Sequence, residues 1–290
     1  MYILESRNIL TPQNGLNIYR GRTEEHILLT EIQGGDSMDI GIKPDAPDLL
    51  AGVLRTRKNK GIILMGNLGD PYNIYEESYR ITRKCLKIIE NSDYGVVIST
   101  KQNRILRDLD VLSGISRKTK IVVDITLPSL DDEILWKIEG RETISVKERL
   151  ELIKRLKSEG IDVIVTLFPV ITFVNDTEKE ITDIVNCLAD YDVAGIDLSD
   201  LRLAVKKSAR EFFYGEFAKR FPEQYKNYIN EYKETGELYP RDYKIVLENV
   251  SRLCDDKGLM YDSKKIKAYK RQYENKQTGE QLTLEQFLTN

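Results

Sequence analysis

Polar side chains that follow short apolar runs are the residues of this sequence that could do chemistry. The runs are rich in Val, Ile and Leu and are bounded by glycine or turn residues, as is typical of buried strands in a parallel sheet. In parallel α/β folds, ligands bind at the carboxyl ends of the strands. The residues that we expect to line such a cavity are Tyr19, Gly66, Asn67, Asp70, Thr100, Lys101, Asp124, Asn175 and Asp197.

The segment GNLGDPY, residues 66–72, is the most informative of these strand ends. Its two glycines allow the backbone to approach a ligand closely, and Pro71 fixes the turn after Asp70. The competing interpretation is an ordinary strand-to-helix turn in which Asp70 is a cap. Elsewhere the sequence contains neither a P-loop nor a G-x-G-x-x-G fingerprint.

Histidine and cysteine usage excludes several kinds of site. His26 is the only histidine, so a cluster of metal-binding histidines cannot be assembled. The three cysteines, Cys85, Cys187 and Cys254, are too scattered for a disulfide framework or a zinc pattern. Cys85 and Cys187 fall at apolar positions of helical patterns, which predicts that they are packing residues.

Charge and hydropathy limit the partners of the protein. The 44 basic and 47 acidic residues give a formal net charge of −3, so there is no overall attraction to nucleic acid or acidic lipid. No apolar run approaches the roughly 20 residues of a membrane helix. The first ten residues, MYILESRNIL, lack the features of a signal peptide. We therefore expect a cytoplasmic protein that does not bind membranes.

The elements that must position the polar residues alternate regularly along the chain. Strands are predicted at 16–20, 61–65, 94–99, 120–126, 161–168 and 193–198. Helices are predicted between them at 44–57, 76–90, 104–115, 131–138, 146–159 and 178–191. This order predicts the α/β class with a parallel sheet covered on its outer face. Six such units favour a partial (β/α)6 TIM-type barrel, with a doubly wound open sheet as the alternative.

The C-terminal part of the chain has a different pattern. Residues 1–205 are predicted to form the barrel, and residues 206–290 a helical C-terminal extension packed on it. The segment after Asp262 predicts a marginal helix followed by a loose end. A stripe of aromatic residues suggests either a base-stacking surface or, more commonly, packing. Its members are Tyr225, Tyr228, Tyr232, Tyr239 and Tyr243.

Several long segments, in the same order, resemble the radical S-adenosylmethionine (SAM) superfamily, and within it the spore photoproduct lyase-like or DNA-repair-photolyase-like group. NILTPQNGLNIYRG at 8–21 is similar to the group's lead-in to its cluster loop. GDPYNIYEESYRITRKCLKII at 69–89, STKQNRILRDLDVL at 99–112 and FPVITFVND at 168–176 are similar to three further segments. The resemblance covers almost the whole chain. It implies a partial (β/α)6 barrel that binds SAM and a [4Fe–4S] cluster.

The sequence departs from the family where the cluster would bind. After N-x-Y-R-G the family has C-x-x-x-C-x-x-C, and here those positions are Arg22, His26 and Leu29. Leucine cannot ligate iron, the guanidinium has no lone pair to give, and one histidine does not replace three thiolates. We therefore predict no iron–sulfur cofactor and no metal site. SAM binding should be weakened, because the cluster would normally chelate its methionine part.

Three functions are compatible with these features. The first is a cluster-less pseudoenzyme that keeps the barrel as a ligand-binding or protein-interaction scaffold. The second is an enzyme that uses the same cavity for SAM or a nucleotide without radical chemistry, with Lys101, Asp124, Asp70 and Asp197 as its acid–base groups. The third is a nucleic-acid-binding relative of a DNA-repair lyase, using the basic segment 55–60 and the basic tail. A basic run is usually a solvated face, so the third has the least weight.

Overall fold

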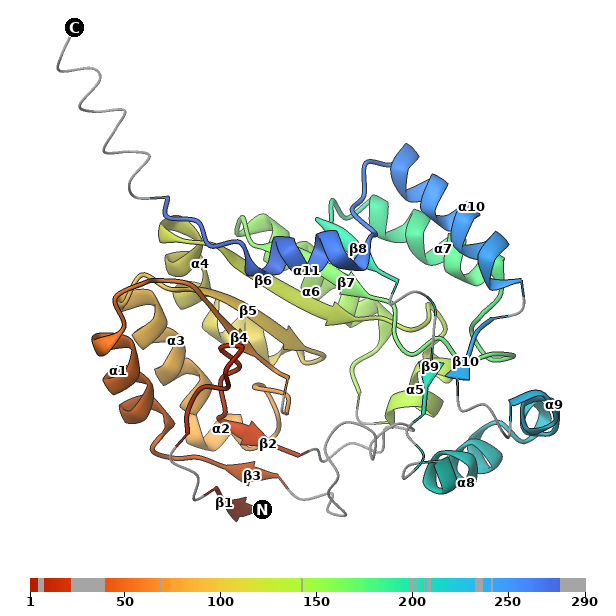
Figure 1. The fold of residues 1–290 in the computed structure, drawn as a ribbon, viewed down its shortest axis with the longest axis horizontal. Coiled ribbons are helices and arrows are strands. Elements are labelled where there is room, and N and C mark those ends of the chain that lie inside the picture. Colours follow the sequence, from red (N-terminus) through yellow and green to blue (C-terminus); the bar gives the residue numbers. More distant parts are fainter. Residues whose placement is uncertain are drawn as a thin grey trace, which may run out of the picture.

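A five-stranded parallel sheet forms the centre of the protein in a computed structural model (Figure 1). Its order, β4-β5-β6-β7-β8, follows the chain. The strands are Ile62–Met65, Gly95–Thr100, Ile121–Thr126, Asp162–Thr166 and Gly195–Asp197. The structure describes residues 1–4, 8–21, 40–67, 69–141, 143–198, 201, 203–205, 207, 210–232, 237–240 and 242–276. The predicted α/β class and partial barrel are confirmed.

The helices that connect the strands cover one face of the sheet, as sequential right-handed crossovers require. They are α1 (Ala46–Thr56), α2 (Glu76–Tyr79), α3 (Ile81–Asn91), η1 (Asn103–Asp108, a 3₁₀ helix), α4 (Leu109–Lys118), α5 (Asp132–Glu139), α6 (Val146–Ser158) and α7 (Glu178–Ala189). Two of them begin at capping boxes, Ser145 with Glu148 and Thr177 with Glu180. The helix predicted at 76–90 is divided at Arg80, whose φ is 50°.

The first predicted strand, 16–20, takes a different course from the prediction. Gly15 forms a single parallel bridge with Leu64 of β4. The chain then turns away, so that β2 (Tyr19–Arg20) pairs antiparallel with β3 (Gly41–Ile42), which also pairs with β1 (Tyr2–Ile3). Beyond the bridge, the Ile18 carbonyl accepts from the Lys43 N–H at 2.9 Å, so the chain follows β3 and not β4. A full sixth parallel strand therefore does not form here.

The two faces of the sheet are buried by different parts of the chain. On the outer face, Ile63, Ile98 and Val123 pack into the main core with the crossover helices. On the inner face, a layer of four strand residues is covered by the C-terminal segment, whose helix α11 (Ser263–Arg271) lies beside the sheet (Figure 1). The layer consists of Ile62, Val97, Val122 and Ile164, and the residues packed on it are Met260, Ile266, Tyr269 and Tyr273.

Helices α8 (Arg210–Arg220) and α9 (Pro222–Tyr232) supply the aromatic residues of a second, smaller core, to which Ile138 and Ile171 also belong. Tyr228 is fully buried there, with its ring centroid 4.5 Å from that of Phe217, so this member of the aromatic stripe is a packing residue. Next to this core, β9 (Leu203–Ala204) pairs with β10 (Glu237–Leu238). Helix α10 (Tyr243–Asp256) packs on α7. None of the helices in the described part of the chain has both the length and the apolar character needed to cross a bilayer.

Candidate functional site

A pocket of about 400 Å³ lies between the inner face of the sheet and helix α11. This volume falls within the range of about 300–1,000 Å³ that is usual for small-molecule sites. The residues that the sheet and its loops contribute are Leu64, Asn67, Val97, Ser99, Asp124 and Asp197. Those that α11 contributes are Ser263, Ile266, Lys267, Lys270 and Arg271.

Strand periodicity places the polar floor of the pocket. Ser99 lies two residues after Val97, and Asp124 two residues after Val122, so each polar side chain shares a face with an apolar one. The apolar residues form the covered inner layer, and the polar ones follow nearer the carboxyl ends of the strands. Gly66 makes this arrangement possible: its φ is 102°, and a Cβ there would lie 2.1 Å from the Ser99 carbonyl oxygen.

Asp124 is the most connected residue of the pocket floor. The Thr166 hydroxyl donates to one carboxylate oxygen at 2.7 Å, and the Lys270 ammonium lies 2.7 Å from the other. The Ser99 hydroxyl is 3.4 Å from that second oxygen. At the far side of the floor, the Ser263 hydroxyl donates to Asp197 at 2.9 Å. The floor carboxylate Asp124 therefore carries its counter-ion within the protein.

The residues predicted to form one cavity lie in several places. Asn67, Asp124 and Asp197 line the pocket, and Gly66 adjoins it. The other predicted residues do not contribute to its lining, and their polar groups have partners elsewhere. They are Tyr19, Asp70, Thr100, Lys101 and Asn175.

Asp70 ties the loop after β4 to the end of β5. Its carboxylate accepts hydrogen bonds from the Thr100 hydroxyl at 2.7 Å and from the Lys101 N–H at 3.0 Å. It also accepts from the Tyr72 N–H at 2.8 Å. The bond to the Tyr72 N–H agrees with the interpretation of GNLGDPY as a strand-to-helix turn. The bonds to Thr100 and Lys101 additionally connect this turn to the end of β5.

The Asn175 side chain hydrogen-bonds to backbone groups and does not face the pocket. It is 1% exposed. Its amide group donates to the carbonyls of Pro128 and Pro169 at 2.8 and 2.9 Å and accepts from the Ile171 N–H at 2.7 Å. These bonds connect the loop after β6 to the loop after β7, so the role of Asn175 is to fix the two loops relative to each other.

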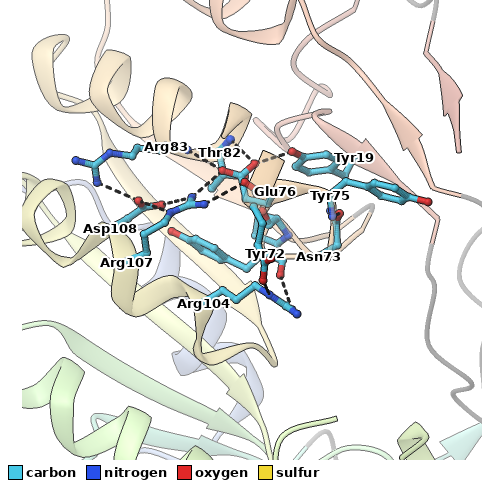
Figure 2. A network of polar contacts seen from close by, with 12 residues as sticks. Tyr19, Tyr72, Asn73, Tyr75, Glu76, Thr82, Arg83, Arg104, Arg107 and Asp108 are labelled. Atoms are coloured by element: carbon cyan, nitrogen blue, oxygen red, sulfur yellow. Dashed lines mark hydrogen bonds and ion pairs between the residues drawn. The ribbon is translucent and has the colours of Figure 1, made fainter. Parts of the chain in front are cut away.

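A buried network around Glu76, missed from the sequence, anchors Tyr19 (Figure 2). The Tyr19 hydroxyl donates to the Glu76 carboxylate at 2.6 Å, and Arg107 pairs with the same carboxylate at 2.8 Å. Arg107 and Arg83 both reach Asp108, at 2.9 and 3.0 Å. Glu76 and Asp108 are completely buried. The signal in the sequence was the charged pattern of YEESYRITRK and NRILRDLD, where acidic and basic residues interleave with apolar ones.

Burial sets the ionisation of the tyrosines in this network. Burial, and then the neighbouring Glu76 carboxylate, raise the pKa of Tyr19 well above its ordinary value. Burial and Asp108 do the same for the pKa of Tyr72. Both phenols are therefore neutral across the physiological pH range, and Tyr19 acts as a hydrogen-bond donor.

Lys101 belongs to a second buried cluster. Its ammonium lies 3.4 Å from Glu139, which also pairs with the fully buried Arg149. The Thr143 hydroxyl donates to Glu139 at 3.0 Å, and the Arg149 guanidinium donates to the Thr126 carbonyl. This cluster joins the end of β6 to α5 and α6, and Lys101 contributes to it through its contact with Glu139.

The predicted degenerate cluster positions, Arg22, His26 and Leu29, lie outside the described residues. The three cysteines lie on α3, α7 and α10, with Cys85 and Cys254 buried. Burial raises the pKa of each thiol, that of Cys254 to about 11. Within the described ranges, no group of three or more His, Cys, Asp or Glu side chains is placed to hold a metal ion.

Comparisons with curated proteins find distant relatives. No protein-family model matches the chain. "Uncharacterized protein Rv2578c" of Mycobacterium tuberculosis is 24% identical over 191 residues, which cover 66% of this chain and 55% of that protein. "Uncharacterized protein MJ0683" of Methanocaldococcus jannaschii is 25% identical over 206 residues, covering 71% and 65%. The chain thus spans between half and two thirds of the length of these relatives.

Solved structures give the closer architectural match. A mutant of spore photoproduct lyase superposes with a TM-score of 0.57 at 16% identity, covering 77% of this chain and 66% of that one. Spore photoproduct lyase complexed with dinucleoside spore photoproduct gives 0.55 at 17% identity, covering 74% and 63%. This chain shares the fold of spore photoproduct lyase. At such identity the likeness concerns the fold alone, and function must be argued from the site.

Proposed function

We propose that this protein is a radical-SAM-fold pseudoenzyme, which binds a small molecule in its barrel pocket and performs no reductive SAM cleavage. The observation that carries the proposal is the replacement of all three thiolate positions of the cluster loop by Arg22, His26 and Leu29. The pocket at the strand ends supports a retained binding role. We further propose a cytoplasmic location, with a protein partner as the alternative to a small-molecule ligand.

The residues present do not fit an iron–sulfur cluster. Such clusters are held by deprotonated cysteines, and one histidine is a poor substitute for three. The cysteines that the chain does possess lie on three different helices, with thiol pKa values raised by burial. A raised thiol pKa disfavours the thiolate form that binds iron. No catalytic step is therefore assigned to a cluster or to a SAM radical.

The deciding experiment is anaerobic iron–sulfur reconstitution of the full chain, followed by iron quantification and visible absorption spectroscopy. We expect less than one iron per chain and no brown colour. Incubation with SAM and dithionite should give no 5′-deoxyadenosine by chromatography. A wild-type protein that carries four irons and cleaves SAM would overturn the proposal.

A restored-motif variant serves as the matched comparison. The triple substitution Arg22→Cys, His26→Cys and Leu29→Cys returns the C-x-x-x-C-x-x-C spacing to the chain. We expect this variant to take up iron under conditions in which the wild type does not, because the three missing thiolates are then supplied. Equal iron uptake by both proteins would contradict the assignment of these positions.

A second candidate is an enzyme that uses the pocket for SAM or a nucleotide without radical chemistry. Asn67 and Ser99 favour it, because they could hydrogen-bond to ribose hydroxyls. The contacts of the proposed acid–base groups weigh against it, since Asp70 and Asp124 are already engaged by hydrogen bonds or an ion pair. Calorimetry with SAM and S-adenosylhomocysteine tests this candidate, and submicromolar binding of either would support it.

A further inference from the structure

We infer that the pocket beneath α11 binds a small anion that carries hydroxyl groups, with a phosphate monoester of a sugar as the type of ligand. This inference rests on the proposed binding role of the pocket and names its ligand class. It depends on three features of the pocket. These are the positive charge of the α11 side chains, the fixed position of that helix, and the hydrogen-bonding side chains of Asn67 and Ser99 on the sheet side.

The charges lining the pocket are unbalanced. Its lining contains the carboxylates of Asp124 and Asp197 and the cationic groups of Lys267, Lys270 and Arg271. Lys270 is paired with Asp124. In the part of the chain that the structure describes, Lys267 and Arg271 have no ion pair or hydrogen bond to another side chain. The pocket therefore carries surplus positive charge, and an anion is the ligand that this charge favours.

The two unpaired cations share one face of α11. Lys267 and Arg271 are four residues apart, which places them one helical turn from each other on the side of Ser263. Ser263 itself donates to Asp197 in the pocket floor. Lys264 and Lys265 lie on the same helix but do not line the pocket. Of the five basic residues of the helix, three line the pocket and two do not.

Helix α11 is anchored over the sheet by bonds near its C-terminal end. The Tyr269 hydroxyl donates to Asp162 at 2.5 Å, and the Lys120 ammonium lies 3.5 Å from the centroid of the Tyr269 ring. Lys120 also pairs with Glu274 at 2.9 Å. Beyond the helix, the Tyr273 hydroxyl donates to the Asp93 carbonyl at 2.8 Å. These bonds fix the roof of the pocket before any ligand arrives, which lowers the cost of binding.

The fixed roof limits the size of the ligand. Ile266 and Tyr269 cover the inner face of the sheet, so a polymer strand cannot lie along it while α11 is in place. The remaining volume of about 400 Å³ suits a small molecule. Opposite the cations, Asn67 and Ser99 offer an amide and a hydroxyl that can bind the hydroxyl groups of a sugar.

Isothermal titration calorimetry of the full chain with ribose 5-phosphate tests the inference. We expect saturable binding by the wild type, and at least tenfold weaker binding of both inorganic phosphate and uncharged ribose. The double variant Lys267→Gln, Arg271→Gln should lose at least tenfold in affinity for ribose 5-phosphate. The matched control, Lys264→Gln with Lys265→Gln, removes the same charge from the same helix and should stay within twofold of the wild type.

A third variant separates the two parts of the ligand. Asn67→Ala should weaken the binding of ribose 5-phosphate and leave the binding of inorganic phosphate unchanged. Circular dichroism on each variant shows whether α11 and the fold persist. These readouts do not depend on iron, so a failure here is distinct from a failure of the pseudoenzyme proposal.

Three results would overturn the inference. The first is the absence of binding of both ribose 5-phosphate and inorganic phosphate at millimolar concentrations. The second is an equal loss of affinity in both double variants, which would mean general electrostatic attraction rather than a site. The third is tight binding of a single-stranded oligonucleotide that depends on Lys267 and Arg271, which would assign the cations to a nucleic acid.

Discussion

Glu76 is the side chain on which the buried polar network converges. One completely buried carboxylate accepts from a tyrosine hydroxyl, pairs with a guanidinium and accepts from two backbone N–H groups, those of Thr82 and Arg83. Removing one partner of a buried ion pair costs more than the pair itself contributes, because the other charge is left without compensation. The segment between β4 and α3 therefore depends on this residue.

Replacing Glu76 by Gln should lower the free energy of unfolding by about 3 kcal/mol, because Arg107 loses one of its two buried counter-ions and the Tyr19 hydroxyl and Thr82 N–H lose a charged acceptor. Urea unfolding followed by circular dichroism measures the change. The matched control is Glu77→Gln at the next position, whose carboxylate is 65% exposed and pairs with Arg104 on the surface. Its loss should be below about 1 kcal/mol. Similar losses in the two variants would show that the network does not have this role.

The raised pKa of Tyr19 predicts how stability changes in alkali. The unfolded chain ionises this phenol near its ordinary pKa of 10.0, while the folded chain retains the proton, so stability present below pH 10 is lost as the pH rises further. Tyr19→Phe removes the ionisable phenol. The free energy of unfolding should then fall less steeply above pH 10, by up to about 1.4 kcal/mol per pH unit. Urea titrations at two alkaline pH values give the slopes. Parallel slopes for wild type and variant would refute the assignment.

Individual residues show where sequence information ends. Asp70 was predictable both as a cavity residue and as a turn residue, because both roles follow from its place after a strand. The choice depends on where Thr100 and Lys101 lie, some thirty residues further along the chain. Asn175 illustrates the same point, since its three partners are backbone groups of two loops, one after β6 and one after β7. Local pattern identifies polar residues at strand ends but not the direction in which they point.

Among the elements, α11 differs most from what the sequence suggested. Five of its nine residues are basic, and this composition conceals the buried Ile266 and the partly buried Tyr269, both of which pack on the sheet. The strands and crossover helices were predictable because their apolar patterns are long and regular. The pairing of α11 with the inner face depends on contacts with residues more than a hundred positions earlier, such as Asp162.

Ile266 should therefore contribute strongly to stability. It is 1% exposed and fills the inner layer against Ile62, Val97, Val122 and Ile164. Ile266→Ala should lower the free energy of unfolding by about 2–4 kcal/mol, through lost burial and the cavity left behind. The control is Ile245→Ala on α10, where the side chain is 57% exposed and the change should stay within about 0.5 kcal/mol. A loss at Ile266 no larger than at Ile245 would mean that α11 is not packed on the sheet.

At the scale of the whole molecule, the regular alternation of strands and helices was sufficient to predict a partial barrel. The course of the first predicted strand was not predictable, because only Gly15 bridges to β4 and the chain from Tyr19 onward pairs with β3. The division of the chain at residue 205 stays a prediction. The pocket itself could not be predicted in full, since five of its eleven lining residues come from α11.

The bridges at the two ends of the central sheet have a consequence for solubility. An open parallel sheet has two edge strands whose free peptide groups invite pairing with another molecule. Here Gly15 docks on Leu64 at one edge, and Met260 docks on Gly195 at the other, where the Ile196 N–H donates to the Met260 carbonyl at 2.7 Å. The two segments that cover the edge strands, around Gly15 and Met260, are far apart in the sequence. A truncation that removes either segment would therefore expose the unpaired peptide groups of an edge strand. We expect such a truncated protein to aggregate by pairing of these edges between molecules.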